Sequence, residues 1–439
     1  MEKQQKGRVI ITSARNIMAL VIARNLGSKG IEVIAADCIS FTMLAYSKYV
    51  THHEEYTSYE ENEKQFLDDL EKIVKKYKPD DGRPFLLIPV FRETMIIAKN
   101  AERFFPHIKV ATPPFSAIEK VYPKDNLFKT ASRYGVNIPE TYLPEKESDL
   151  EEITSNNPFP LITKPYAGTG GTGIHKVDSK QELIDAFKDN KSNFGSPPLV
   201  QEFVDQDEYC LTTLFDDGKM KAAMAYKNIL EFPQGEGSGV MRENADVDLF
   251  IGEALKLMAP IRWNGIAQID FLWDGNKENK PILLEVNPRF WAGLYQSVQA
   301  GVDFPWLIYK LFTDRLPDHV HKPKYDIKTK LPLVWVASIM QDSININDTL
   351  SGLKDAGEKA FNELRSDKNL SDAFDTFLNE TKSKVKAPFN KDNFKQKWKI
   401  SRNAENEIFS QEDPKASIGI SYALAYWIKY KKLPPEAKP

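Results

Sequence analysis

Cysteine is scarce in this 439-residue chain, long apolar runs are missing, and neither sign of charge dominates. The two cysteines, Cys38 and Cys210, are too few for a disulfide framework or a four-thiolate zinc site. The longest apolar stretches, such as residues 333–340 and 418–428, are far shorter than the roughly 20 residues that a membrane-spanning helix needs. The first residues also lack the apolar segment of a signal peptide. We therefore expect a cytoplasmic protein that has no membrane partner.

The charge balance narrows the class of protein further. The chain has 59 basic and 62 acidic residues, so its formal net charge is only −3. Proteins that bind nucleic acid by neutralising phosphates usually carry a basic excess, so we expect no nucleic-acid partner. Hydrophobic residues make up 41% of the chain and charged residues 28%, which is typical of globular proteins. At roughly 150 residues per domain, this length corresponds to about three domains.

Predicted strands and helices alternate in the first third of the chain. Short apolar runs indicate strands, and amphipathic segments between them indicate helices. The predicted strands are 9–13, 31–38, 85–90 and 109–112, and the predicted helices are 16–28, 60–77 and 94–104. This alternation is typical of βαβ units on a parallel sheet.

The middle of the chain has a different pattern, with strands that follow one another. The predicted strands are 161–164, 199–203, 210–215, 220–226, 266–273 and 281–286, with helices at 180–188 and 249–259. The sequence Asp216-Asp217-Gly218 is a turn signal for an antiparallel hairpin. Beyond about residue 322 the composition becomes more polar and charged, and a helix is predicted over 349–380.

A glycine-rich loop follows the predicted strand that ends at Lys164. Residues Gly168–Gly173 read GTGGTG, so four glycines fall within six positions. Glycine lets the backbone approach a phosphate closely and point its N–H groups at it, and the nearby lysine adds positive charge. No Gly-Lys-Ser/Thr closes the loop, so it is not a Walker A motif. The pattern favours a phosphate-binding loop, with a flexible hairpin that binds nothing as the alternative.

A second group of polar residues lies on the last two predicted strands of this region. Glu285 and Asn287 are two positions apart and so face the same side of a strand, with Arg289 just beyond. Asp270 lies on the preceding strand, and if the two strands pair, three oxygen-bearing side chains converge. Such oxygens are the ligands that Mg²⁺ prefers, and the lack of histidine and cysteine argues against zinc. Solvated acidic residues are the alternative, which the apolar neighbours of Glu285 make weak.

In their order along the chain, these motifs resemble the ATP-grasp superfamily, especially its carboxylate–amine ligases and carbamoyl-phosphate-synthetase-like members. The resemblance covers roughly residues 8–315. It implies a multidomain α/β and α+β protein, in which a Rossmann-like pre-ATP-grasp domain precedes two α+β subdomains that clamp ATP. The implied boundaries are 1–115 for the first domain, 116–200 and 201–321 for the subdomains, and 322–439 for a mostly helical C-terminal extension.

The resemblance also implies roles for single residues. Lys124 and Lys164 would contact the phosphates of ATP, and the loop would close over them with Gly168, Thr169, Gly170, Gly171, Thr172 and Gly173. Glu202, Phe203 and Val204 would hold the adenine, and Glu208 the ribose hydroxyls. Asp270, Glu285 and Asn287 would bind Mg²⁺, or Mn²⁺ in its place. Arg289 and Lys164 would be the catalytic residues, which stabilise the transferring phosphoryl group.

The implied activity is ATP-dependent ligation of a carboxylate to an amine through an acyl phosphate, with release of ADP and phosphate. The expected partners are small-molecule carboxylates and amines, amino acids among the candidates, and a homodimer is an open option. Two alternatives stay open: another ATP-dependent phosphoryl or carboxyl transfer, and a non-catalytic ATP-binding regulatory protein. The sequence names neither the acid nor the amine.

Several further residues have two readings at this stage. Lys227 and Arg242 flank the glycine-rich segment 235–239 and would reach either a phosphate or the substrate. Arg92 follows a strand at the edge where open α/β sheets bind ligands. The aromatic segment 290–295 would either line the acceptor pocket or pack between domains, and packing is favoured. The stretch 418–430 would either dock on the core, which is favoured, or lie on a membrane.

Overall fold

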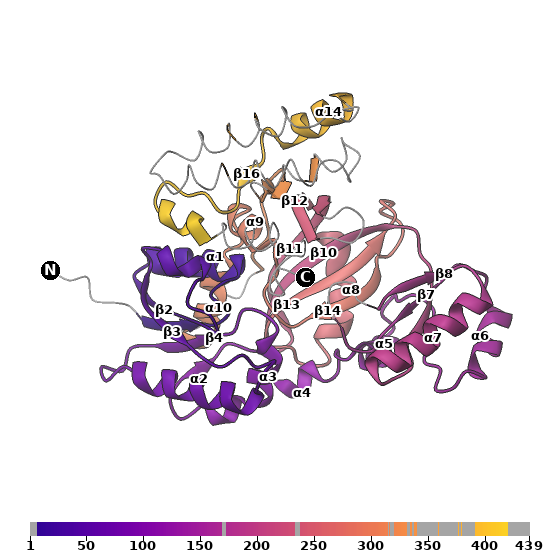
Figure 1. The fold of residues 1–439 in the computed structure, drawn as a ribbon, viewed down its shortest axis with the longest axis horizontal. Coiled ribbons are helices and arrows are strands. Elements are labelled where there is room, and N and C mark those ends of the chain that lie inside the picture. Colours follow the sequence, from indigo (N-terminus) through magenta and orange to yellow (C-terminus); the bar gives the residue numbers. More distant parts are fainter. Residues whose placement is uncertain are drawn as a thin grey trace.

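The computed structural model describes residues 7–168, 173–232, 238–314, 320–331 and 391–419, and isolated residues at 316, 334, 335, 338, 339, 359, 376 and 379. It contains one parallel sheet and two sheets with mostly antiparallel pairing. In Figure 1 the parallel sheet lies on the left, a seven-stranded sheet in the centre and a four-stranded sheet on the right. The mixed α/β fold class predicted from the sequence is thereby confirmed. Among the helices in the described ranges, none has the length and apolar character to cross a membrane.

The N-terminal sheet has the strand order β3-β2-β1-β4-β5, with every pairing parallel. Its strands are β1 (Gly7–Ile11), β2 (Ile31–Asp37), β3 (Val50–Glu55), β4 (Phe85–Ile88) and β5 (Lys109–Val110). Sequence analysis missed β3, a polar edge strand whose side chains are mostly exposed. Strand order reverses between β1 and β4, so their carboxyl ends form the switch point at which open sheets bind ligands.

Three helices connect these strands: α1 (Ile17–Ser28), α2 (Glu63–Tyr77) and α3 (Glu93–Lys99). Helix α2 shows why they form, because its apolar residues recur at three- and four-residue spacing and are all buried. Its first turn is capped by Asn62, whose side chain accepts a hydrogen bond from the Gln65 N–H. Helix α1 instead is buried over most of its surface, since α9 (Leu294–Gln299) and α10 (Phe304–Thr313) pack against it.

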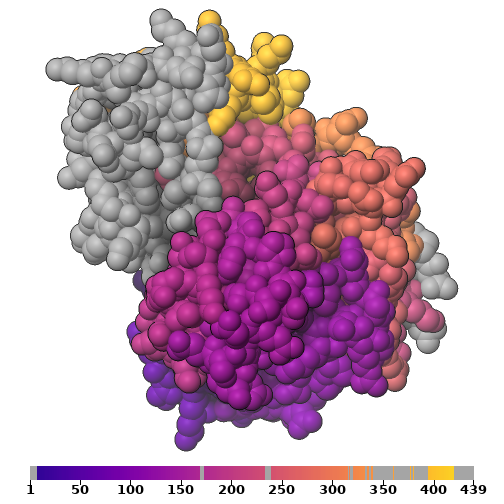
Figure 2. Space-filling view, turned by 90° about the vertical axis from the view of Figure 1, so that its right-hand side faces the viewer, coloured from indigo at the N-terminus to yellow at the C-terminus, as the bar shows by residue number. Residues whose placement is uncertain are grey.

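The four-stranded sheet has the order β6-β9-β7-β8 and is antiparallel throughout. Its strands are β6 (Thr141–Tyr142), β7 (Leu161–Lys164), β8 (His175–Val177) and β9 (Leu199–Glu202). Helices α6 (Asp149–Asn156) and α7 (Lys180–Phe194) cover one face, on which Leu161, Leu183 and Phe187 form a small core. Helices α4 (Phe115–Ile118) and α5 (Lys124–Arg133) connect this unit to the N-terminal sheet. The unit faces the viewer in Figure 2, in violet and magenta.

The seven-stranded sheet has the order β14-β13-β10-β11-β12-β15-β16. Its strands are β10 (Asp207–Asp216), β11 (Lys219–Phe232), β12 (Ser238–Ala245), β13 (Gly265–Trp273), β14 (Ile282–Asn287), β15 (Lys328–Lys330) and β16 (Glu405–Asn406). The predicted hairpin turn is confirmed, because Asp217 and Gly218 connect β10 to β11 with φ angles of 49° and 80°. Helix α8 (Asp248–Met258) packs on one face through Phe250 and Leu257.

The C-terminal segment joins two of these sheets. Strand β16 pairs with β15 at the edge of the seven-stranded sheet. Both strands lie beyond residue 321, within the stretch that the sequence assigned to the C-terminal extension. Farther along, the Asp413 carboxylate accepts from the Arg24 guanidinium at 2.9 Å and from Ser47 at 2.8 Å in the N-terminal domain. Helix α14 (Lys391–Ser401) precedes β16, at the top of Figure 1. The predicted helix 349–380, apart from residues 359, 376 and 379, and most of 418–430 lie outside the described residues.

Candidate functional site

Strand register brings the predicted metal ligands together. Asp270 on β13 lies directly opposite Glu285 on β14, and opposite Cys210 on β10 on its other side. Residues opposite one another share a face of the sheet. The Asn287 amide nitrogen donates to Asp270 at 3.1 Å and to Glu285 at 2.8 Å. The structure thus assembles all three residues at one end of two paired strands, and we call Asp270, Glu285, Asn287 and Glu208 the carboxylate centre.

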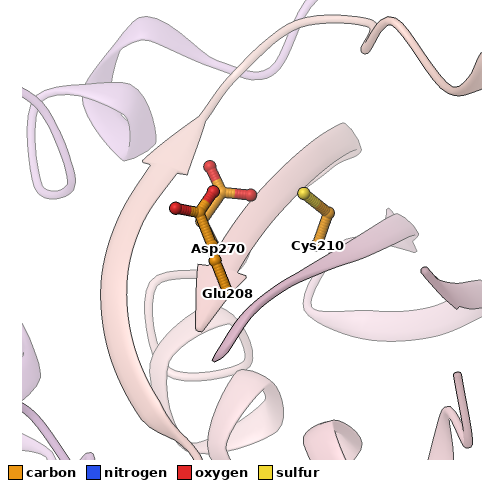
Figure 3. Close-up of side chains that lie close together, drawn as sticks. All are labelled: Glu208, Cys210 and Asp270. Carbon is orange, nitrogen blue, oxygen red and sulfur yellow. The ribbon is translucent and has the colours of Figure 1, made fainter. Parts of the chain in front are cut away.

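The carboxylate centre concentrates negative charge around the buried Asp270. Burial raises the pKa of Asp270 well above its usual range, and the carboxylates of Glu285 and Glu208 raise it further. The ligand atoms of Glu208, Cys210 and Asp270 all lie within 4.8 Å of one another (Figure 3). Part of Glu208 reaches solvent, yet desolvation of its carboxylate and the charges of Glu285 and Glu231 raise its pKa to about 7. Like charges gathered in this way are stabilised when a cation joins them.

Two lysines supply positive charge on the other side of Glu285. Lys124 is buried at the start of α5, and its Nζ lies 3.4 Å from the Glu285 carboxylate and 3.4 Å from the Gly168 carbonyl oxygen. Lys164 ends β7, and burial lowers its pKa to about 8 even though Glu285 raises it. Burial raises the pKa of Glu285 too, but Lys124, the Asn287 hydrogen bond and Arg289 outweigh it, so the net direction is downward.

The residues present fit a divalent cation with hard-ligand preference. Asp270 and Glu285 offer carboxylate oxygens from adjacent strands, and the Asn287 amide contacts both of them. The Asn287 amide also carries an oxygen, and rotation of the amide group by half a turn would present this oxygen beside the Asp270 and Glu285 carboxylates. Mg²⁺ is usually held by one or two carboxylates together with substrate phosphates. The Cys210 thiol is a softer group, and burial raises its pKa well above the usual range, which disfavours the thiolate that a metal binds.

The residues expected around the nucleotide lie where the four-stranded sheet meets the seven-stranded sheet. Glu202 ends β9, Phe203 and Val204 follow on the link to β10, and Glu208 lies near the start of β10. The Lys176 Nζ on β8 stands 4.0 Å above the Phe203 ring, and the exposed Glu202 accepts from the Glu140 N–H at 3.0 Å. This places Glu202 against the neighbouring chain segment rather than in the carboxylate centre.

The glycine loop is only partly described. Thr169, Gly170, Gly171 and Thr172 lie outside the described residues, whereas Gly168 and Gly173 bracket them. Gly173 has a φ of 77°, and a Cβ atom there would stand 2.6 Å from the Phe194 ring, so a larger residue does not fit. Gly168 lies beside Lys124, whose Nζ donates to the Gly168 carbonyl oxygen at 3.4 Å.

Arg289 follows β14 and points toward the N-terminal sheet. Its guanidinium donates to the Phe290 carbonyl at 2.9 Å and lies 5.3 Å from the centre of the Phe91 ring. Burial lowers the pKa of Arg289, while the charges of Glu285 and Asp270 raise it. An arginine that is largely withdrawn from water beside carboxylates is suited to bind a planar anion with two parallel hydrogen bonds.

A pocket of about 150 Å³ separates the carboxylate centre from the N-terminal sheet. Arg92, named from the sequence as a candidate, lies in its wall together with Lys124, Glu285 and Arg289. Gly168 and Asn287, also named from the sequence, line it too, whereas sequence analysis missed Phe91, Thr94, Met95, Val121, Tyr122 and Leu127. Residues 91–95 follow the carboxyl end of β4 at the switch point, and this position was the signal that could have identified them. No local pattern indicates that Val121, Tyr122 and Leu127 line a pocket.

Three other candidates have structural partners. Arg242 is buried and pairs with Glu407 of the C-terminal segment at 2.8 Å, so its charge is already balanced. Lys227 forms an ion pair with Asp207 near the start of β10. Phe290 and Trp291 are fully buried, and the Trp291 ring packs edge-on against Phe304 at 4.8 Å. Phe290 and Trp291 thus pack in a core, as the favoured interpretation of this segment expects.

Comparison with known proteins agrees with this geometry. Residues 123–293 match the family model of the ATP-grasp domain, and the chain thus contains an ATP-grasp domain. The biotin carboxylase domain of the 2-oxoglutarate carboxylase from Hydrogenobacter thermophilus, solved with MgADP and bicarbonate, has a TM-score of 0.60 at 16% identity, covering 74% of both chains. The L-amino acid ligase from Bacillus licheniformis has a TM-score of 0.55 at 18% identity, covering 72% of this chain and 76% of that one.

A curated relative supports the same family. The large chain of carbamoyl phosphate synthase from Caldanaerobacter subterraneus is 22% identical over 227 residues, which is 50% of this chain and 21% of that one. Urea amidolyase from Lachancea kluyveri is 24% identical over 267 residues, which is 57% of this chain and 14% of that protein. The chain thus spans only a small part of these two curated relatives.

Proposed function

We propose that this protein is an ATP-dependent ligase that joins a carboxylate substrate to an amine through an acyl phosphate, with release of ADP and phosphate. One observation carries the proposal: the carboxylate centre faces Lys124, Lys164 and Arg289 beside a pocket that is large enough for a small acid. Anionic and cationic groups in this arrangement are suited to hold a metal–nucleotide complex next to a second, anionic substrate. The similarity of the fold to an L-amino acid ligase supports the same reading.

The proposed nucleotide site uses residues from both ATP-grasp sheets. Lys124 and Lys164 neutralise phosphate oxygens, and the backbone at Gly168 and Gly173 begins and ends the loop over them. Glu202, Phe203, Val204 and Glu208 lie toward the adenosine, on the link and strand between the two sheets. Asp270, Glu285 and Asn287 would hold Mg²⁺, or Mn²⁺ in its place, and the bound ion would neutralise charge on the phosphates.

The proposed reaction has two displacements. A carboxylate oxygen of the substrate attacks the γ-phosphorus of ATP, the bond from that phosphorus to the β–γ bridging oxygen breaks, and ADP leaves. The amine nitrogen then attacks the carbonyl carbon of the acyl phosphate, the bond to the phosphate oxygen breaks, and inorganic phosphate leaves. The amine proton passes to solvent. Arg289 lies where it can bind the carboxylate and then the oxygen that becomes negative in each displacement.

The proposed division of the chain follows its three sheets. Residues 1–115 form the pre-ATP-grasp domain, 116–200 and 201–321 the two subdomains, and the remainder an extension. The boundary near 321 is approximate in this proposal because β15 and β16 complete the sheet of the second subdomain.

The proposed function is tested by measuring Mg²⁺-dependent ADP release across a matrix of small acids and amines, bicarbonate included. We expect ADP only when an acid is present and a stable amide when the matching amine is added. Glu285→Gln should abolish ADP release, whereas the exposed Glu278→Gln on the same hairpin should not change it. Equal activity in Glu285→Gln and wild type would contradict the role of the centre. Turnover with bicarbonate alone would point to carboxyl transfer.

A further inference from the structure

The Phe91 ring contacts two arginines that line the pocket. The guanidinium carbons of Arg92 and Arg289 each lie over this ring, 5.3 Å from its centre. Both distances fall within the roughly 6 Å over which an aromatic face attracts a cation. All three residues belong to the lining of the pocket beside the carboxylate centre. A single ring therefore contacts two cations at the edge of the proposed site.

The contact between Phe91 and Arg289 joins two different parts of the fold. Phe91 follows β4 of the N-terminal sheet, whereas Arg289 follows β14 and lies within the residues that match the ATP-grasp domain. The Arg289 guanidinium also donates to the carbonyl of Phe290 at 2.9 Å. Because Phe290 is its neighbour in the chain, that hydrogen bond does not fix Arg289 relative to the N-terminal sheet. The ring contact does.

The Phe91 ring is itself held by its surroundings. Phe91 is 9% exposed and belongs to a core cluster that also contains Val90 and Trp291. Its N–H donates to the buried Glu93 carboxylate at 3.3 Å, and its carbonyl accepts from the Thr94 N–H at 3.1 Å. A ring whose backbone and side chain are both packed provides a fixed surface for a long, flexible arginine side chain.

The ring also offsets the repulsion between the two arginines. Arg92 and Arg289 carry like charges, and the charge of Arg92 acts on Arg289. The face of an aromatic ring is the negative end of its quadrupole, so it attracts each guanidinium group. The attraction is stronger where water is excluded, and Arg289 is partly buried. An aliphatic side chain of similar size would fill the same space and leave the repulsion unopposed.

Building on the proposed function, we infer that Phe91 is a positioning residue for the proposed catalytic residue Arg289. The face of its ring fixes the guanidinium where that group binds the substrate carboxylate and the transferring phosphoryl group. The ring acts through Arg289 and takes no part in bond making or breaking. The N-terminal sheet thereby contributes to the chemistry of the ATP-grasp domain, in addition to forming one wall of the pocket.

The inference is tested first by steady-state ADP release with the acid that supports turnover. Phe91→Leu should lower kcat by about threefold to thirtyfold, the range expected for a lost cation–π contact. The KM for ATP should stay the same, because the ring acts on Arg289 rather than on the residues proposed to hold the nucleotide. Phe91→Tyr keeps the ring face and should retain most of the wild-type kcat.

The matched control is Phe85→Leu. Phe85 is 7% exposed and begins β4, the strand that Phe91 follows, but it packs in a different core cluster and outside the pocket lining. The same substitution at this position removes a buried ring from the same sheet. It should leave kcat unchanged.

A fluorination series separates the charge of the ring face from the shape of the ring. Fluorinated phenylalanines with one, two or three fluorine atoms, introduced at position 91 by stop-codon suppression, withdraw electrons from the face and nearly keep the ring size. The logarithm of kcat should fall steadily with each added fluorine. A ring that only fills space would give the same kcat throughout the series.

A second measurement requires no turnover. A proton over the face of a ring is shifted upfield by the ring current, so the Arg289 Nε–H signal in the full chain labelled with ¹⁵N-arginine should lie upfield. Its loss in Arg289→Lys assigns the signal. Phe91→Leu should remove the upfield shift, and Phe85→Leu should keep it.

The outcomes distinguish this inference from the ligase proposal. An unshifted Arg289 signal in wild type, an unchanged kcat in Phe91→Leu or a flat fluorination series would overturn the inference and leave the ligase standing. An equal loss of kcat in Phe85→Leu would also overturn it, since the effect would then come from weakened packing. An upfield Arg289 signal that is lost in Phe91→Leu, without ADP release from any acid, would uphold the positioning of Arg289 and contradict the ligase.

Discussion

Two groups of carboxylates in this molecule, each with a buried member, have different surroundings. At the switch point of the N-terminal sheet, the Asp37 carboxylate pairs with the Arg15 guanidinium at 2.8 Å and accepts the Arg15 and Cys38 N–H groups at 2.8 and 2.6 Å. Glu93 there accepts from the Thr12 hydroxyl and from the Val90 N–H at 3.1 Å. We call Arg15, Asp37 and Glu93 the switch-point cluster. These donors come from the protein itself, although the second Glu93 carboxylate oxygen has no hydrogen-bond partner among the described residues.

The carboxylate centre, by contrast, places carboxylates against carboxylates. The donors to Asp270 are the neutral amides of Gln268 at 2.7 Å and Asn287 at 3.1 Å. Asp270 is buried like Asp37 and Glu93, whereas Glu285 is partly exposed and Glu208 is exposed, so the carboxylate centre is only partly buried. Asp37 accepts hydrogen bonds from charged and backbone donors of the protein, whereas Asp270 faces other acids and is arranged for an external cation.

The sharpest test of this comparison is Asp270→Asn. We expect a loss of about 10² to 10³ in the rate of ADP release, because one charge that supports phosphoryl transfer is removed. In metal-free protein the free energy of unfolding should stay equal or rise, since like-charge repulsion with Glu285 and Glu208 is relieved. ADP release and urea unfolding measure the two quantities. Loss of stability together with retained activity would make the centre structural.

The second test concerns the pH dependence of stability at Asp37. Burial outweighs Arg15 and raises the pKa of Asp37 to about 6, above its ordinary value of 3.8. The folded state then holds the proton more tightly than the unfolded chain, so the stabilising contribution is present below pH 4 and is lost as pH rises through 6. Relative to Asp37→Asn, wild type should lose about 3 kcal/mol between pH 4 and pH 7. Urea unfolding of both proteins across this range measures it; a constant difference would refute the pKa shift.

The third test compares how Mg²⁺ changes the stability of variants in the carboxylate centre and in the switch-point cluster. With ADP present, Mg²⁺ at ten times its dissociation constant should stabilise wild type by about 1.4 kcal/mol. Asp270→Asn should lose this gain, whereas Asp37→Asn should keep it. Thermal unfolding with and without Mg²⁺, with EDTA as the reversal, measures the effect. An equal response in both variants would place the ion elsewhere.

The smallest expected effect is that of Glu93→Gln. An amide keeps one oxygen acceptor for the Thr12 hydroxyl and the Val90 N–H, but the hydrogen bonds lose the charge that strengthens them. We expect a loss of about 1 kcal/mol in the free energy of unfolding and no change in Mg²⁺ affinity. Chemical denaturation and calorimetry give both values. Weakened metal binding in this variant would mean that the two clusters are coupled.

The features of the fold and site that depend on residues close together in the sequence were predictable. Alternating strands and helices gave the parallel sheet, and the two-residue spacing of Glu285 and Asn287 placed them on one face of a strand. Asp216 to Gly218 marked the β10–β11 turn. In each case the relevant contacts lie within one element or between neighbours in the chain.

The parts that depend on distant contacts were not predictable. Cys210 stands beside Asp270 only because β10 and β13 pair, although the two residues are far apart in the sequence. Arg242 looked available for a phosphate until Glu407, far along the chain, was found to balance it. Thr94 gave no signal, because a threonine in the first turn of a helix is ordinary until the opposing wall of a pocket is known. Edge strand β3 was missed because exposed polar residues do not alternate with apolar ones.

The central claim is that the carboxylate centre serves ATP-dependent activation of an acid. The most direct measurement is trapping of the acyl phosphate with hydroxylamine, in reactions that contain ATP, Mg²⁺ and the acids that support ADP release. The account predicts a hydroxamate in amounts equal to the ADP formed by wild type, and none by Asp270→Asn. ADP formation without any hydroxamate, or hydroxamate formation at the wild-type rate by Asp270→Asn, would contradict it.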